Sequence, residues 1–335
     1  LIKFIKKNPE KLGLYPDPDS IELHEEIAEM LNKTGGCLCR AKFSGKNILP
    51  SEEDKIPFTV TKDMIYTGNG SDEVLSFVFY AFFSSNKKFV MPEHTYSFYP
   101  VYAGFYNIPM DRIPLKKDWS LDTESMLSHA EQNAGGIIFA NPNAPTGLSL
   151  TREQVRGMLL KASKDEIFIV DEAYCDFGGE SCIPLLAEFS NLVIVRTFSK
   201  SLSGAGMRLG YIVSNPELIN IVTTVKNSVN HFPLDAVSQI AGKEACRDIG
   251  YYCECAKNVA DTRDDFYNFL INKGFYVIPS KTNFLFAKKE GIAGEQLYKK
   301  IKEEGILIRH FKTSGIEDFV RISIGTPSQM AKLKE

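Results

Sequence analysis

The stretch from Val195 to Tyr211, VRTFSKSLSGAGMRLGY, constrains this chain more than any other part of its sequence. An apolar run typical of a buried strand, Leu192 to Val195, leads into hydroxyl side chains and ends on Lys200. Arg208 follows eight positions later, so hydroxyl groups and a guanidinium can hold an anion beside the lysine amine. An amine next to a phosphate site suits a Schiff base with a phosphorylated aldehyde. Taken alone, the stretch fits a serine-rich turn with a surface lysine equally well.

The bulk properties exclude several classes of protein. The 335 residues, 44% apolar and 24% charged, suffice for one large globular domain and a smaller one. A net charge of -3 without a basic block argues against nucleic acid or a membrane surface as a partner. The apolar runs are of strand length rather than membrane-span length, and the opening residues, LIKF, lack the apolar core of a signal peptide.

The cysteines indicate a reducing compartment. There are seven of them, an odd number scattered over a long chain, which is typical of a cytoplasmic protein. Cys37-x-Cys39 and Cys253-x-Cys255 both lack the spacing of a zinc site, and the second pair falls in a helical pattern where the two side chains point apart. We therefore expect no metal site.

The chain divides into three parts by pattern. Residues 1–20 form a proline-rich arm, residues 21–235 a large α/β domain, and residues 236–335 a smaller α+β domain. Within the large domain, residues 34–62 lack periodic apolar positions and are predicted to form a loop-like insertion. Strands alternate with helices after the insertion, which indicates a mainly parallel sheet covered by helices on both faces. The predicted strands are Lys88 to Met91, Gly136 to Asn141, Ile167 to Asp171 and Leu192 to Thr197.

Local signals mark the ends of several elements. Ser20 is suited to cap a helix that starts at Ile21, and Thr151 to start a helix with Gln154 in its first turn. In the C-terminal part a helix is expected at Gly294 to Glu304. The strands expected there are Phe275 to Ile278, Asn283 to Phe286, Ile306 to Ile308 and Phe319 to Ile324.

Candidate ligand-binding residues follow the predicted strands, whose carboxyl ends are where open α/β sheets bind ligands. Gly70, Ser71 and Asp72 open a helix, and a helix N-terminus can hold a phosphate, although a plain helix cap explains them too. Asp171 ends a fully apolar strand, and its carboxylate suits a protonated ring nitrogen in a partly buried site. As with Ser71 and Asp72, a helix cap is the simpler alternative for Asp171.

Three further side chains complete the set. Tyr96 follows a strand and can stack on a flat ring, although a lone tyrosine is more often a core residue. Arg321 interrupts an apolar strand, where a guanidinium needs an anionic partner, either a substrate or an internal carboxylate. Arg309 follows another apolar run and can point to the same place.

These features occur together and in one order: a glycine loop, a tyrosine, NPxxPTG, DxxY, a Ser-Lys pair, an arginine and a late strand arginine. They resemble the fold-type I pyridoxal-phosphate aminotransferases. Four motifs, YPDP, GNGSDE, TYSFYPVY and RTFSKS, are most similar to the histidinol-phosphate aminotransferases within that family. The likeness runs from about Tyr15 to the C-terminus, interrupted by residues 34–62.

The resemblance implies a role for each matching residue. Lys200 would carry the pyridoxal 5'-phosphate and move a proton at the substrate, and Asp171 would keep the cofactor's ring nitrogen protonated. Tyr174 would hydrogen-bond the ring hydroxyl and Tyr96 would stack on the ring. Tyr15 would reach the cofactor phosphate from a second subunit, so the resemblance implies a homodimer with a shared active site. The residues expected around the cofactor phosphate are Gly70, Ser71, Asp72, Thr197, Ser199 and Arg208, and those expected to bind the substrate's anionic group are Arg321 and Arg309.

One departure from the family pattern affects the cofactor site. The family usually has an asparagine before the proline of the PTG motif, and here that position is Ala144. Either Asn143 makes the missing contact with the cofactor and substrate, or Tyr174 makes the bond to the ring hydroxyl alone.

The implied reaction is the transfer of an amino group between L-histidinol phosphate and 2-oxoglutarate in histidine biosynthesis. Two other enzymes on the same scaffold remain open: a threonine-phosphate decarboxylase and an aromatic amino-acid aminotransferase. A cofactor-binding regulator or a decayed homologue is the non-enzymatic alternative, and the presence of Lys200, Asp171, Tyr174 and Arg208 together argues against it.

Overall fold

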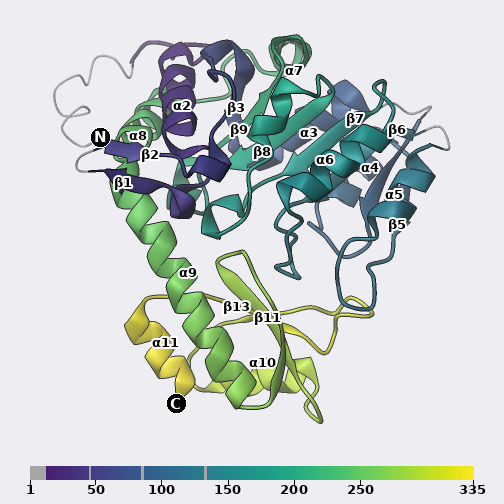
Figure 1. Cartoon of the computed structure of the whole chain (residues 1–335), viewed down its shortest axis with the longest axis vertical. Helices are drawn as coiled ribbons and strands as arrows, with labels where there is room; N and C mark the ends of the chain where they lie inside the picture. The colour runs from purple at the N-terminus through teal and green to yellow at the C-terminus, as the bar shows by residue number, and fades with distance from the viewer. Residues whose placement is uncertain (1–12, 45–46, 84–86, 132–133) are drawn as a thin grey trace.

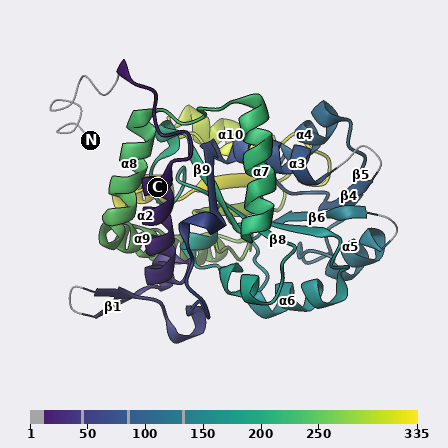
Figure 2. The same cartoon turned by 90° about the horizontal axis from the view of Figure 1, so that it is seen from above.

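The computed structural model describes residues 13–44, 47–83, 87–131 and 134–335. These residues form a seven-stranded sheet with its helices, and a four-stranded sheet that lies below it (Figure 1). The long helix α9 (Ile249–Asn272) runs from one to the other. Viewed from above, helices lie on both sides of the larger sheet (Figure 2).

The large sheet has the order β3-β9-β8-β7-β6-β4-β5. Neighbours from β8 to β5 are parallel, whereas β9 runs antiparallel to both β8 and β3. The α/β fold expected from the sequence is therefore confirmed. Its strands are β3 (Ile65–Asn69), β4 (Lys88–Pro92), β5 (Met110–Ile113), β6 (Ala134–Ala140), β7 (Ile167–Asp171), β8 (Leu192–Thr197) and β9 (Leu209–Ser214).

Both faces of this sheet are buried, which explains why its central strands are apolar throughout. On β7, Phe168 and Val170 join one core cluster while Ile169 between them joins the other. A strand buried on both faces shows no polar alternation, so its limits are easy to recognise in a sequence. The predicted limits of β7 and β8 agree with the structure.

The helices divide between the two faces. Helices α3 (Gly70–Phe82), α4 (Tyr99–Tyr106) and α7 (Pro216–Val229) contribute to the cluster around Ile169. The opposite face is covered by α2 (Ile21–Thr34), α5 (Thr123–Ala130), α6 (Arg152–Lys161) and α8 (Ala236–Arg247).

The predicted start of α6 is confirmed and that of α2 is wrong in its cap. Thr151 and Gln154 form a reciprocal capping box at the start of α6. Ser20 precedes α2, but it has φ 50°, in the left-handed region, and its hydroxyl makes no cap hydrogen bond. The carboxylate of Asp17 instead accepts the backbone N–H of Ile21 at 2.7 Å.

The predicted insertion is more ordered than a loop. It contains a hairpin of β1 (Lys42–Ser44) and β2 (Asn47–Leu49) and short 3-10 turns. Asp54 is completely buried, and its two carboxylate oxygens each lie 2.7 Å from a guanidinium, of Arg40 and of Arg152. Because Arg152 is the first residue of α6, this buried cluster fixes the insertion to the large sheet's helical layer.

The smaller sheet has the antiparallel order β10-β11-β13-β12. The strand expected at Ile306 to Ile308 is wrong. Those residues precede the two residues, Arg309 and His310, that pair with Arg321 and Val320. The elements here are β10 (Phe275–Ile278), β11 (Phe284–Lys289), β12 (Arg309–His310), β13 (Val320–Ser323), α10 (Gly294–Glu303) and α11 (Pro327–Lys334).

The packing of α8 bears on where the smaller unit begins. The expected boundary after residue 235 placed α8 in the smaller unit, yet Ala245 and Cys246 of α8 are buried in the same core cluster as α2. Farther along α9, Phe266 and Leu270 pack in the core of the smaller sheet. We therefore propose that the boundary lies within α9.

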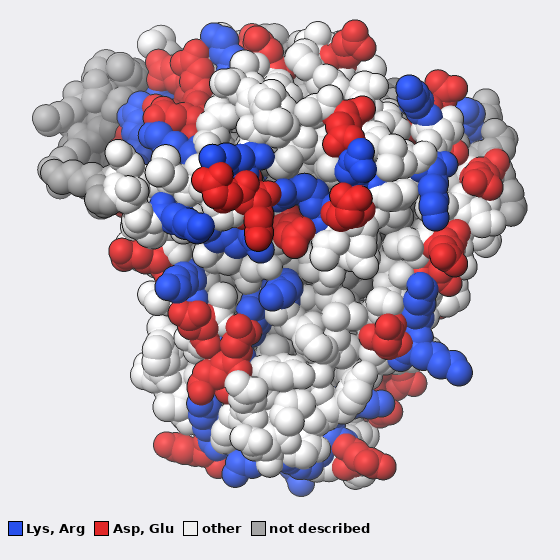
Figure 3. All heavy atoms as spheres, viewed as in Figure 1, with Lys and Arg blue, Asp and Glu red and all other residues white. Residues whose placement is uncertain are grey.

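The charges on the visible face are mixed. Acidic and basic side chains are interspersed over both parts of the molecule (Figure 3). In the part of the chain that the structure describes, no helix is both long and apolar enough to cross a membrane.

Candidate active site

The register of the parallel strands brings the predicted site residues together. Asp171, the last residue of β7, lies beside Ala140 of β6 and Val195 of β8. Lys200 follows in the turn after β8, and its Nζ lies 5.3 Å from the centre of the Tyr174 ring. Asp171 and Tyr174 after β7 and Lys200 after β8 therefore lie at one edge of the sheet, because neighbouring parallel strands end there.

Asp171 is a buried carboxylate with a hydrogen bond to each oxygen. It is 5% exposed; Oδ2 accepts the Tyr99 hydroxyl at 2.8 Å, and Oδ1 accepts the Ala173 backbone N–H at 3.1 Å. Burial raises the pKa of Asp171 to about 6, although these two donors and the charge of Lys200 oppose the rise. The group can therefore hold a proton-bearing partner near neutral pH.

The N-terminus of α3 forms a narrow cradle with Arg208. Gly70 has φ 82°, and a Cβ at this position would overlap the Arg208 guanidinium. A Cβ at Gly210 on β9 would likewise overlap the backbone of Gly70 and Ser71. Both glycines are needed so that the backbone N–H groups of this helix end and the guanidinium can approach one anion together.

The side chain of Asp72 holds its neighbours in the cradle and does not itself bind the anion. Nη2 of Arg208 donates to Oδ2 of Asp72 at 3.2 Å, and the Tyr96 hydroxyl donates to Oδ1 at 2.7 Å. A carboxylate repels a phosphate, so the side chain of Asp72 can only hold Arg208 and Tyr96 in place. The donors available to an anion are then the helix N-terminus, Arg208 and nearby hydroxyl groups.

The hydroxyl groups come from the turn that carries Lys200. Thr197 ends β8, and its Oγ1 accepts the backbone N–H of Ser199 at 3.1 Å, which closes the turn on itself. Thr197 is buried and Ser199 is half-buried, so both lie at the base of the site rather than on the outer surface.

A buried charge network supports the same turn from below. Arg196 is 2% exposed and its guanidinium lies 3.2 Å from Glu172 and 3.4 Å from Asp176. Asp176 accepts the Ser201 hydroxyl at 2.5 Å and the backbone N–H of Leu38 at 3.0 Å. The residue next to Lys200 is thereby linked to the start of the insertion.

The side-chain amide of Asn143 forms hydrogen bonds with the loops around it. Its Nδ2 donates to the carbonyl of His94 at 2.9 Å and to Thr146 Oγ1 at 3.1 Å, and its Oδ1 accepts the Thr95 hydroxyl at 2.8 Å. Both amide protons are therefore used to hold the loop before Tyr96. Tyr174, whose hydroxyl makes no hydrogen bond within the described residues, remains the side chain suited to a ring hydroxyl.

A cavity of about 540 Å³ separates this edge of the large sheet from the smaller sheet. Tyr96 and Ala144 line one side of it, and Arg309 and Arg321 line the other. The two arginines are direct neighbours, because they are paired residues of β12 and β13. Both arginines therefore line the same cavity.

Arg321 has the character of an anion-binding residue. Its guanidinium stacks 4.9 Å from the Phe284 ring, and its buried Nε has no hydrogen-bond partner in the described part of the chain. The described residues also give it no carboxylate within ion-pair distance. A buried donor without a partner is costly, so an anion in the cavity would satisfy it.

Comparisons with known proteins show the family to which the chain belongs. The model of the family "aminotransferase class I and II" matches residues 2–335. The chain is 42% identical over 329 residues to a histidinol-phosphate aminotransferase of Syntrophus aciditrophicus, covering 98% of this chain and 84% of the relative.

The chain belongs to the aminotransferase class I and II family. It is also 38% identical over 333 residues to histidinol-phosphate aminotransferase 1 of Oceanobacillus iheyensis, covering 99% of this chain and 85% of the relative. The fold matches the crystal structure of histidinol-phosphate aminotransferase from Sinorhizobium meliloti in complex with pyridoxal-5'-phosphate, with a TM-score of 0.82. That match covers 99% of this chain and 84% of the other at 21% identity. The predicted family and enzyme class are confirmed.

Tyr15 lies on the surface of this aminotransferase. It is 83% exposed, and its ring stacks on Phe232 with 4.7 Å between ring centres. The described part of the N-terminal arm, residues 13–20, forms a strap that is held nearby. Lys226 is 2% exposed, and its Nζ donates to the Pro18 carbonyl at 2.8 Å and lies 3.5 Å from Asp19.

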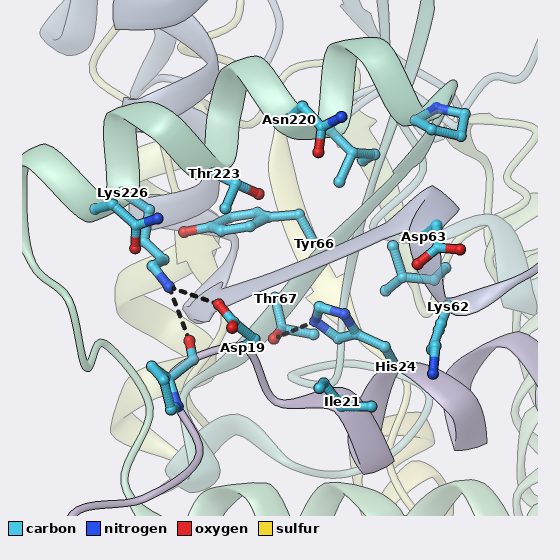
Figure 4. A pocket seen from close by; sticks show the side chains of 15 residues that line it. Asp19, Ile21, His24, Lys62, Asp63, Tyr66, Thr67, Asn220, Thr223 and Lys226 are labelled. Carbon is cyan, nitrogen blue, oxygen red and sulfur yellow. Dashed lines mark hydrogen bonds and ion pairs between the residues drawn. The ribbon is translucent and has the colours of Figure 1, made fainter.

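This anchor lies in a second cavity, of about 720 Å³, between α7, β3 and the strap (Figure 4). The cavity is separate from the lysine turn and from the two arginines. His24 at its base bonds Thr67 Oγ1 through Nε2 at 3.0 Å. Burial lowers the pKa of His24 to about 4.

Sequence reasoning missed Tyr99, Tyr102 and the Arg196 network. The signal for the tyrosines was present, because Tyr96, Tyr99 and Tyr102 recur at every third residue and their hydroxyls all reach Asp72 or Asp171. A charge within the otherwise apolar β8 was the corresponding signal for Arg196.

We expect His24 to make the folded state sensitive to acid. Its pKa is about 4 when folded and about 6.5 when unfolded, so below pH 6.5 the unfolded chain takes up a proton that the folded chain refuses. The free energy of unfolding should therefore fall as pH drops from 6.5 to 4, by about 3 kcal/mol from this group. Urea unfolding at pH 7 and pH 5 should show a smaller loss for His24→Gln than for the wild type. An equal loss in both proteins would contradict this assignment.

Proposed function

We propose that this chain transfers the amino group of L-histidinol phosphate to 2-oxoglutarate, with pyridoxal 5'-phosphate as its cofactor. The products are imidazole-acetol phosphate and L-glutamate, and the reaction belongs to histidine biosynthesis. The observation that carries the proposal is the 42% identity, over 98% of the chain, to a relative named for this activity. The cofactor is supported by the family and by the groups that the site presents.

The residues present fit a flat, phosphorylated pyridine aldehyde. Gly70 and Gly210 leave room for a phosphate at the start of α3, and Arg208 lies against that opening. Asp171 is a buried carboxylate at the end of β7, and Lys200 lies beside Tyr174. An anion cradle, an amine and a carboxylate in this order match the three reactive parts of the cofactor.

Bound pyridoxal phosphate supplies an aldehyde that condenses with amines and a ring that withdraws electrons from the substrate's Cα. The chain's own residues prepare and use these properties. Lys200 would hold the cofactor covalently, and once the substrate amine has displaced it, its free amine would move the proton at the substrate Cα. Asp171 holds a proton at the ring nitrogen, and Tyr174 donates to the ring hydroxyl.

The phosphate end is held by a helix N-terminus and by side chains. The backbone N–H groups of Ser71 and Asp72 and the guanidinium of Arg208 bind the anion, with Thr197 and Ser199 as hydroxyl donors. Tyr96 lines the cavity in front of this cradle, where its ring can stack on the cofactor.

The substrate's own phosphate goes to the arginine pair. Arg321 offers an unpartnered buried Nε, and Arg309 lies across from it on the neighbouring strand. In the other half-reaction the same pair takes a carboxylate of glutamate. Fixing this anion on the smaller sheet holds the substrate Cα near Lys200, which supplies proximity rather than chemistry.

We also propose that two chains form a homodimer with a shared active site and work in the cytoplasm. Tyr15 supports the dimer, because it stays 83% exposed although the strap behind it is anchored by buried Lys226. The seven cysteines are all free, and five of them are buried, which supports a reducing compartment.

The direct test supplies purified protein with pyridoxal phosphate, L-histidinol phosphate and 2-oxoglutarate, and measures L-glutamate. We expect glutamate to appear in step with loss of histidinol phosphate, without release of carbon dioxide. Carbon dioxide released from L-threonine phosphate would instead identify a decarboxylase. A comparable rate with L-phenylalanine would identify an aromatic aminotransferase.

Replacement of Arg321 should weaken substrate binding more than it slows the chemistry. Arg321→Gln keeps the shape of the stem but removes the charge, and a charge-assisted hydrogen bond contributes about 1.5–3 kcal/mol. The KM for L-histidinol phosphate should therefore rise by roughly 10- to 100-fold. Steady-state kinetics with both amino donors measure this, and the KM for L-glutamate should rise as well.

Lys288→Gln is the matched control. Lys288 lies on β11 of the same sheet and also stacks on aromatic rings, but it lies outside the arginine-lined cavity. Its replacement should leave both KM values unchanged. Equal KM changes in the two variants would mean that overall charge, and not the site at Arg321, governs binding.

A further inference from the structure

Three tyrosines at the start of α4 direct their hydroxyls at two carboxylates of the site. Tyr96 and Tyr102 both reach Oδ1 of Asp72, at 2.7 and 3.4 Å. Tyr99 lies between them in sequence and differs from both, because its hydroxyl donates to Oδ2 of Asp171 at 2.8 Å. The segment therefore separates two functions, one at the phosphate end and one at the ring-nitrogen end.

The side chain of Tyr99 is more deeply buried than those of Tyr96 and Tyr102. It has no exposed surface, and its ring packs in the core cluster on one face of the large sheet, 6.2 Å from the Phe79 ring. Its first-turn position in α4 fixes the backbone behind it. A hydroxyl on a buried, tightly packed ring is a preorganised donor, because it loses little freedom when it bonds.

The two oxygens of Asp171 then have distinct surroundings. Oδ2 is held by Tyr99 from α4, and Oδ1 is held by the Ala173 N–H from its own loop. Two donors from different elements fix the plane of the carboxylate. Each oxygen still has a second lone pair for a partner in the site.

The surroundings of Asp171 disfavour the ionised form of its carboxylate. Burial is the largest influence and raises the pKa of Asp171 to about 6, while the Tyr99 hydroxyl, the Ala173 N–H and the Lys200 charge lower it and Asp72 raises it. Among the described residues, Tyr99 is thus the one side-chain hydrogen-bond donor that stabilises the ionised form. Tyr96 and Tyr102 are further titratable groups that act near this carboxylate.

We propose that Tyr99 is a positioning residue for Asp171, which holds this carboxylate ionised and aimed at the ring nitrogen of the cofactor. The inference rests on the proposed function, since it needs the cofactor that this function uses. Tyr99 touches neither substrate nor cofactor in this account. It acts through Asp171 alone.

If Tyr99 had a purely structural role, a different experimental result would be expected. If only the ring mattered, phenylalanine would fill the same space and nothing at the site would change. Tyr99→Phe removes the hydroxyl and leaves the packing in the core cluster. The variant therefore separates the two roles.

The experiment measures the dissociation constant of pyridoxal phosphate from cofactor-stripped protein between pH 5 and pH 8.5, by equilibrium dialysis. Without the Tyr99 donor, Asp171 should stay protonated to a higher pH and pair less well with a protonated ring nitrogen. We expect Tyr99→Phe to raise the dissociation constant at pH 7 by roughly tenfold, as for the loss of one hydrogen bond to a charged group. The pH below which affinity is lost should move upward by about one unit.

Tyr106→Phe provides the matched control. Tyr106 lies on the same helix, and its hydroxyl bonds Ser76 Oγ of α3 at 2.7 Å, away from both carboxylates. Its replacement should leave the dissociation constant and its pH dependence unchanged. A comparable change in Tyr106→Phe would overturn the inference, because it would trace the effect to α4 in general.

A double variant keeps the test decisive. With Asp171→Asn in place there is no carboxylate to hold ionised, so adding Tyr99→Phe should weaken cofactor binding no further. Additive losses would overturn the inference, as would a Tyr99→Phe protein that binds the cofactor like the wild type at every pH. A wild-type protein that binds no pyridoxal phosphate would sink the proposed function itself, a result distinct from either of these.

Discussion

The meeting of parallel strand ends at one edge of the large sheet is the constraint on which the rest of the site depends. β7 ends in Asp171 and β8 leads into Lys200, and their register is set by apolar residues buried on both faces. A slip of this register would move the carboxylate away from the amine and would also disrupt the side-chain packing on both faces of the sheet. The same hydrophobic burial therefore stabilises the fold and sets the distance between the two reactive groups.

Around that edge, each part of the site is held from behind by residues that do no chemistry. Arg196 and Asp176 support the lysine turn, Asp72 holds Arg208, and Asn143 holds the loop before Tyr96. These supports come from four different segments of the chain. Binding groups held in this way can receive a ligand without rearranging, which is the condition for tight positioning of a reacting bond.

Elements that are specified by neighbouring residues could be predicted from the sequence alone. β7 and β8 are fully apolar runs, and the Thr151 capping box needs only a Thr and a Gln three residues apart, so all three were predicted correctly. Ser20 looked like a similar cap, but its backbone is left-handed, and Asp17 bonds the helix start instead. Backbone conformation at a single residue is not readable from its type.

The parts that could not be predicted depend on contacts between distant segments. Asn143 was one of two candidates for a contact with the cofactor, and its amide forms hydrogen bonds with His94, Thr95 and Thr146. Tyr99 bonds a residue 72 positions away, and Asp54 draws in Arg152 from 98 positions away. No local sequence pattern indicates that residues so far apart in the chain will form a pair. The family resemblance predicts which residues form the site, and the structure adds which neighbouring residues hold them.

The measurement that tests the central claim most directly is reductive trapping of the cofactor on the protein. Protein incubated with pyridoxal phosphate is treated with borohydride, digested and analysed by mass spectrometry. The account predicts that the cofactor becomes attached at Lys200 and that Lys200→Ala protein carries no specific label. Attachment at a different lysine, or no attachment to the wild-type protein, would contradict it.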